Sequence, residues 1–139
     1  MNLSRTIEQL EAKPWPEPTP SATELIRRCH ALRRIPVGQL EPGDLRVLIG
    51  QDIALKYLVP LALAALRAEP MLEADYYPGD LLVALMSVEH GFWANNQESL
   101  AQLGRLVRQA QELIAANEQP SVFRQVAKDI ARFQARGAA

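Results

Sequence analysis

Cysteine is almost absent from this sequence, in which Cys29 is the single one among 139 residues. A lone thiol excludes an internal disulfide. The N-terminus also lacks the basic, apolar and small-residue succession of a secretion signal, so we expect a reducing, cytoplasmic location. His90 has no second histidine or cysteine at metal-ligand spacing, and therefore no metal and no cofactor is expected.

Long apolar runs and strand patterns are also missing. The longest apolar run, Tyr57–Leu66, falls far short of the roughly 20 residues that cross a bilayer, and Lys56 and Arg67 flank it closely. Apolar residues instead recur at helical spacing along most of the chain, whose length is typical of one domain. We therefore expect no membrane span and an all-α single domain over residues 1–139, a bundle of about six to seven helices.

Prolines and caps predict where the helices begin and end. Residues 13–20, KPWPEPTP, form an extended proline-rich linker that Trp15 pins to the body, because each proline removes a backbone donor and fixes φ. The sequence SATE, Ser21–Glu24, has the spacing of a capping box, and Pro60 is expected to kink the apolar central helix. Helices are expected over about residues 4–11, 21–34, 42–49, 52–68, 79–88, 98–117 and from 120 onward, with a turn at 90–98.

Catalytic chemistry has little support in the residue pattern, and we expect no enzyme. Cys29 and His30 are neighbours that a helix points about 100° apart, which does not suit a pair that shares one proton. Glu73, Asp75 and Asp80 could form an acid and base pair or bind a divalent cation. Asp80, however, falls near the start of a helix, where a carboxylate stabilises the free amides and the helix dipole.

Charge is distributed unevenly, although the net charge is only −1. Residues 68–104, here called the acidic window, contain six acidic side chains and no lysine or arginine, so the formal charge is −6 there, +2 before it and +3 after it. This asymmetry suits the orientation of a charged partner. Glu73 and Asp75 belong either to a solvated loop or to a contact surface. Tyr76 and Tyr77 precede a proline in extended backbone, so their rings are expected to point to opposite sides, with one of them free to anchor an interface.

The last expected helix carries a row of basic side chains. Arg124, Lys128, Arg132 and Arg136 are four residues apart and share its outer face, and we call them the basic stripe. Such a run is usually a solvated face, and no aromatic residue interleaves with it to stack on bases. Nucleic-acid binding through the basic stripe, by a small helical adaptor or regulator, is the alternative function. In a further interpretation, the basic stripe contacts acidic residues of the same chain.

Three stretches of the sequence resemble a known family. WPEP at Trp15–Pro18, LRVLIGQDIALKYLVPLAL at Leu45–Leu63 and YYPGDLL at Tyr76–Leu82 are similar, in order and spacing, to small bacterial immunity proteins of contact-dependent growth inhibition systems. The resemblance covers residues 1–95. It implies a cytoplasmic protein that binds and neutralises the C-terminal toxin domain delivered by a neighbouring cell, with no enzymatic activity and no direct contact with nucleic acid or membrane.

The resemblance does not transfer a binding site residue by residue, so the contact surface is predicted from the charge pattern. Many toxins of these systems are nucleases, and an acidic face can cover the basic surface that holds phosphate. We therefore predict that the acidic window occludes a nuclease toxin. If the toxin is of another kind, the basic stripe is the alternative contact. The predicted contact set is Glu73, Asp75, Tyr76, Glu89, Trp93 and Glu98.

Overall fold

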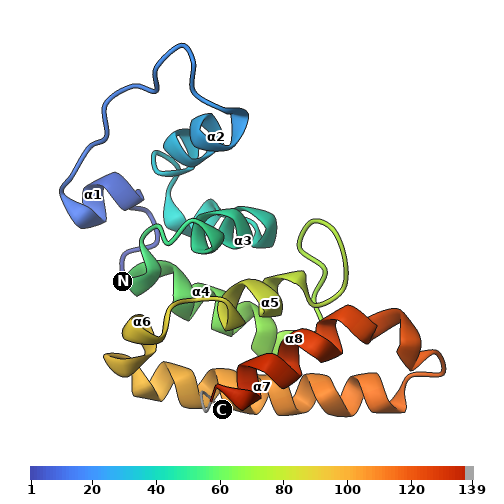
Figure 1. The fold of residues 1–139 in the computed structure, drawn as a ribbon. Helices are drawn as coiled ribbons and strands as arrows, with labels where there is room; N and C mark the ends of the chain where they lie inside the picture. The colour runs from blue at the N-terminus through green and yellow to red at the C-terminus, as the bar shows by residue number, and fades with distance from the viewer. Residues whose placement is uncertain (137–139) are drawn as a thin grey trace.

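A computed structural model describes residues 1–136 of the chain (Figure 1). Helices make up 65% of the structure, and the described residues contain eight α-helices and no strand, with two isolated β-bridges. The all-α expectation is confirmed, whereas the end of the expected domain, residues 137–139, lies outside the described residues. The helices are α1 (Ile7–Glu11), α2 (Glu24–Leu32), α3 (Pro42–Gly50), α4 (Leu55–Ala68), α5 (Asp80–Met86), α6 (His90–Ala94), α7 (Gln97–Ala116) and α8 (Arg124–Ala135), with 3₁₀ helices at Val37–Gln39 and Pro120–Phe123.

The helices pack around one hydrophobic core (Figure 1). Helices α3, α4 and α5 lie in the centre, α7 and α8 run along one side of them, and α1, α2 and the linker lie on the other side. Buried apolar side chains form one cluster from Ile7 in α1 to Phe133 in α8. Leu58, Ala62 and Leu66 of α4 are fully buried because residues four apart share one helix face. Among residues 1–136, no helix combines the length and hydropathy that crossing a membrane requires.

The central helix α4 begins later than the sequence predicts. Asp52 and Ala54 have positive φ angles of 57° and 52°, so the chain turns there and the helix begins at Leu55. Pro60 lies inside α4, which continues through it to Ala68. A kink at Pro60 stays a prediction.

Trp15 holds the linker against α2, as expected. Its ring meets the ring of His30 edge to face at a centroid distance of 4.9 Å. The guanidinium of Arg33 lies 4.0 Å from the centroid of the same ring. Farther along the linker, Glu17 forms an ion pair of 2.7 Å with Arg34. The extended segment is therefore fastened at two places to the end of α2.

The expected start of α2 and the expected turn at residues 90–98 are both wrong. Helix α2 begins at Glu24, and its N-cap is Thr23, whose Oγ1 accepts a hydrogen bond of 3.2 Å from the amide of Ile26. The box expected at Ser21–Glu24 does not form because Glu24 is itself the first helical residue. The expected turn at 90–98 contains the short helix α6, which accounts for the eighth helix.

Candidate functional site

The acidic window contributes to two separate places on the molecule. Glu73, Asp75 and Tyr76 belong to the loop between α4 and α5, residues 69–79, which we call the contact loop and which stands out beside α3 (Figure 1). The other members of the predicted contact set are in or next to α6, at the opposite end of the molecule (Figure 1). The six residues therefore do not form one continuous patch.

The contact loop is built around the carboxylate of Asp80, the first residue of α5. Oδ1 accepts a hydrogen bond of 2.7 Å from the amide of Ala74, and Oδ2 accepts bonds of 2.9 Å from the amides of Asp75 and Tyr76. The side chain is only 3% exposed. Asp80 thus holds the loop that precedes its helix, which is more than the helix-dipole role predicted from the sequence.

The ends of the contact loop are closed by its own backbone. Glu73 and Pro78 form an isolated antiparallel bridge, and the amide of Gly79 donates to the carbonyl of Leu72 at 3.2 Å. Gly79 has a φ angle of 92°, a left-handed conformation that glycine adopts without a Cβ clash. The bridge and this turn bring the chain back to the start of α5.

Arg46 of α3 binds the same loop from outside. Its Nε donates to Oδ2 of Asp75 at 2.9 Å and lies 4.0 Å from Oδ2 of Asp80. The ring of Tyr76 faces the Arg46 guanidinium at 4.7 Å. Gly43, one turn earlier in α3, leaves space for the Asp75 carboxylate, because an added Cβ would overlap it. Within residues 73–76, Asp75 and Tyr76 therefore have a structural role that the sequence did not reveal.

Tyr76 is the most exposed large hydrophobic side chain in the described part of the chain, at 73%. Tyr77 is 39% exposed. Burial raises the pKa of Tyr77, and the negative charges of Asp129 on α8 and of Asp80 act in the same direction. The ring of Tyr76 lies against Arg46 of α3, and the expectation that the two rings point to opposite sides stays a prediction. Neither ring is fully buried.

The part of the contact set near α6 is less suited to contact than predicted. Trp93 is fully buried and packs edge to face on Phe92 at a centroid distance of 5.1 Å, so it is a core residue and does not face a partner. The prediction of Trp93 as a contact residue is wrong, because α6 turns its ring inward. Glu89 and Glu98 are exposed at the ends of α6 and α7.

The free acidic charge is smaller than the sequence count. Arg46 partly neutralises Asp75 and lies near Asp80. Within residues 1–136, no ion pair involves Glu69, Glu73, Glu89 or Glu98. The unpaired acid nearest to Tyr76 in the sequence is Glu73, which is exposed.

Three residues of the basic stripe lie on α8 and Arg136 is the C-cap of that helix; all four side chains are exposed. Arg132 forms an exposed ion pair of 3.5 Å with Asp129 of the same helix. Arg136 donates to the carbonyl of Met86 at 3.4 Å, which ties the end of α8 to the end of α5. The stripe therefore has contacts within the chain at its C-terminal half.

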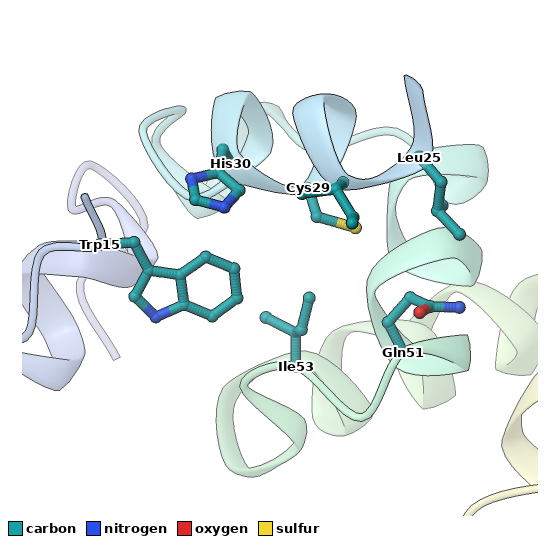
Figure 2. Close-up of a pocket in the computed structure, with 7 residues that line it drawn as sticks. Trp15, Leu25, Cys29, His30, Gln51 and Ile53 are labelled. Carbon is teal, nitrogen blue, oxygen red and sulfur yellow. The ribbon is translucent and has the colours of Figure 1, made fainter. Parts of the chain in front are cut away.

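A separate pocket of about 240 Å³ lies between the linker, α2 and the turn before α4 (Figure 2). Figure 2 shows the ring of Trp15 facing Cys29 and His30 of α2, with Ile53 opposite. Cys29 is buried, and burial raises the pKa of its thiol more than the charge of Arg28 lowers it. His30 is half-buried against Trp15. This pocket has none of the acidic residues of the window in its lining.

Residues 1–136 contain no group of three or more histidine, cysteine, aspartate or glutamate side chains that could hold a metal ion. Of the three carboxylates that the sequence also allowed as a cation site, Asp75 pairs with Arg46 and Asp80 accepts hydrogen bonds from backbone amides. Tyr76, its guanidinium neighbour and the nearby carboxylates together place aromatic, cationic and anionic groups side by side.

A family model matches most of the chain. A family model described as CDI immunity proteins, where CDI stands for contact-dependent growth inhibition, matches residues 9–103. The matched range includes Arg46, the contact loop and Asp80, whereas the basic stripe lies outside it. No curated protein and no solved structure matches the chain.

Proposed function

The chain belongs to the family of CDI immunity proteins, and from that membership we propose that it recognises its toxin through the contact loop. Immunity proteins of this family neutralise the cognate toxin of a contact-dependent growth inhibition system. We propose further that binding occludes the active or substrate-binding surface of the C-terminal toxin domain in the cytoplasm, without any reaction catalysed by the immunity protein itself.

The observation that carries the choice of surface is the exposed Tyr76 ring held against Arg46. Tyrosine and arginine are the residue types that most often dominate the binding free energy of interfaces. The ring is 73% exposed and lies 4.7 Å from the guanidinium, so it presents a large apolar area with a fixed orientation. A partner that covers Tyr76 would also desolvate the neighbouring charges.

The charge of the surroundings supports a basic partner surface. Glu73 is exposed and unpaired among residues 1–136, and Glu69 flanks it at the end of α4. A nuclease needs a basic surface to hold phosphate, and carboxylates beside an aromatic anchor complement such a surface. We therefore propose a nuclease toxin, whose phosphate-binding surface the contact loop covers.

The test measures the affinity of the purified toxin domain for variants of the immunity protein, together with protection of cells that produce the toxin. Tyr76→Ala is expected to raise Kd by about 30-fold or more, as truncation of a dominant interface residue does. Glu73→Lys should weaken binding in the same direction. Glu112→Lys, which makes the same charge change on the exposed face of α7 outside the window, is the matched control and should leave Kd unchanged.

The pair Glu89→Lys and Glu98→Lys tests the other end of the acidic window. If these two variants lose affinity while Tyr76→Ala and Glu73→Lys keep it, the contact surface is near α6 and the loop assignment is wrong. If no variant changes affinity although the parent protein binds and protects, the acidic window is not the contact surface.

The second candidate function is nucleic-acid binding by the basic stripe, and the exposure of all four side chains is the observation that favours it. Phosphate contacts make affinity fall steeply with salt concentration. Titration of the protein with a DNA or RNA duplex at low salt checks this reading. A flat titration removes it, and binding that Lys128→Gln and Arg132→Gln weaken would support it.

A further inference from the structure

We infer that Asp80 is the positioning residue of the contact loop, and that its buried carboxylate sets the backbone shape in which Tyr76 and Glu73 meet the toxin. The inference deepens the proposed function and rests on it. Asp80 itself is only 3% exposed, so it acts through the loop and does not touch the partner.

The first step of the inference is the convergence of three successive amides on one carboxylate. Ala74, Asp75 and Tyr76 all donate to Asp80, within a span of six residues. Three consecutive donors aimed at one group fix the backbone dihedrals between them. The bridge between Glu73 and Pro78 closes the base of the loop, so the carboxylate determines the shape of the tip.

The second step is that the tip carries the exposed groups. Tyr76 is the most exposed large hydrophobic side chain of the loop, and its own amide is one of the three donors. The position of its Cα is therefore set directly by the carboxylate. Arg46 then orients the ring from the α3 side, through the 4.7 Å contact with Tyr76 and the 2.9 Å hydrogen bond to Asp75.

The third step concerns affinity. A loop that is ordered before binding loses less conformational entropy when the partner arrives, so a fixed loop binds more tightly than a floppy one with the same side chains. Removing the charge of Asp80 alters none of the side chains that are exposed on the loop. It should nevertheless weaken toxin binding, because the partner would then have to order the loop.

Asp80→Asn is the main variant, since it keeps the shape of the side chain and replaces one acceptor oxygen with a donor group. Only one of the two oxygens remains, so the three amide hydrogen bonds cannot all persist. We expect Kd for the toxin domain to rise about tenfold or more, and hydrogen exchange of the amides of residues 74–76 to accelerate by a similar factor. The amides of the core helix α4 should exchange as slowly as they do in the parent protein. Glu112→Gln removes the same charge from an exposed position and is the matched control.

Gly43→Ala tests the same inference without altering the buried carboxylate. A Cβ at position 43 would overlap the Asp75 carboxylate and displace it from Arg46, which loosens the attachment of the loop to α3, whereas alanine favours the helix in which it lies. Gly91→Ala, in α6, is the matched control because nothing lies within 4 Å of the added Cβ. If Asp80→Asn does not fold, Gly43→Ala tests the inference in its place.

The outcomes separate the inference from the proposed function. If the parent protein and both controls bind the toxin, weaker binding by Asp80→Asn or Gly43→Ala together with faster exchange at residues 74–76 supports the inference. Faster exchange with unchanged Kd overturns it, and so does weaker binding with unchanged exchange. If the parent protein does not bind the toxin domain at all, the proposed function fails and the inference falls with it.

Discussion

Arg33 is a fully buried arginine whose guanidinium lies 4.0 Å from the ring centroid of Trp15. The same guanidinium donates to Glu11 at 2.7 Å and to the carbonyl of Lys13 at 2.9 Å, and it lies 3.7 Å from Glu8. One side chain at the end of α2 therefore joins the first helix to the linker. The contacts with Trp15 and with the carbonyl of Lys13 hold the start of the linker, whose prolines do not suit a helix interior.

We predict that Arg33→Lys destabilises the protein although it keeps the charge. Lysine has no planar fork of donors and cannot stack on Trp15 while it also binds Glu11 and the backbone. The free energy of unfolding should fall by about 2 kcal/mol, and by about 2 to 5 kcal/mol for Arg33→Ala, which removes a fully buried side chain and leaves a cavity in its place. Urea unfolding measures both values. Arg105→Lys on the exposed face of α7 is the control, and equal midpoints for Arg33→Lys and Arg105→Lys would contradict the role of Arg33.

A second prediction concerns the stability of the protein in acid. Burial alone would raise the pKa of Asp80, but hydrogen bonds from the amides of Tyr76, Ala74 and Asp75 outweigh it and hold the pKa below the ordinary value of 3.8. The unfolded chain therefore binds a proton at this group more readily than the folded protein does. The stability that Asp80 contributes is present above its unfolded-state pKa of about 4 and is lost as pH falls through the lower folded-state pKa.

Urea unfolding of the parent protein and of Asp80→Asn between about pH 6 and about pH 2.5 checks this prediction. The difference in unfolding free energy between the two proteins should be about 3 kcal/mol near neutral pH, because buried hydrogen bonds to a charged acceptor are lost, and should shrink as pH falls. Other carboxyl groups titrate in both proteins and cancel in this difference. A difference that stays constant with pH would show that Asp80 does not change its proton affinity on folding.

A third prediction concerns the thiol of Cys29. Burial raises its pKa, and the side chain is only 4% exposed, so reaction with a thiol reagent should be slow in the folded protein and fast in denaturant. Trp15→Ala should open the pocket in Figure 2 and raise the labelling rate by about tenfold or more. The chain has one cysteine, so the absorbance of the released reagent reports this site alone. Labelling of the folded parent protein as fast as in denaturant would contradict the burial of Cys29.

A fourth prediction uses the turn before α5. Gly79→Ala should lower the free energy of unfolding by about 1 to 2 kcal/mol, because φ is 92° and an L-residue is strained there. The added Cβ would also approach Cε of Met71 at 3.0 Å. Gly50→Ala, at the end of α3 with open space around the Cβ, should change stability by no more than about 1 kcal/mol and favour the folded state. Thermal unfolding distinguishes the two variants, and equal shifts of their midpoints from that of the parent protein would exclude strain at Gly79.

Helix positions could be predicted well from the sequence because burial repeats with the helical period. In α7, Leu103, Leu106, Val107 and Ala110 are all buried, as their spacing indicates. The start of α4 could not be predicted, because nothing in the apolar pattern marks the positive φ angles of Asp52 and Ala54. The short helix α6 was missed because a polar stretch with two asparagines favours a turn, while the burial of Trp93 stabilises a helix there.

The candidate site could be predicted only in part. The loop with Glu73, Asp75 and Tyr76 was found from its charge and its exposed aromatic residue. Its partner Arg46 lies 29 residues earlier than Asp75, and no local spacing connects the two. The sequence predicts that Asp80 stabilises its own helix, because a carboxylate in a first turn commonly binds helix amides. The competing donors, the amides of the preceding loop, depend on tertiary structure.

The anchoring of the contact loop through main-chain amides has a consequence for evolution. Asp80 binds the backbone of residues 74–76, which every amino acid except proline supplies in the same form. Side chains at positions 73 and 76 can therefore be exchanged while the loop keeps its shape. Most members of a library randomised there should retain the parent's thermal midpoint and yet differ in which toxin they bind. If the contact loop binds the toxin as proposed, the protein can follow a changing toxin without changing its fold.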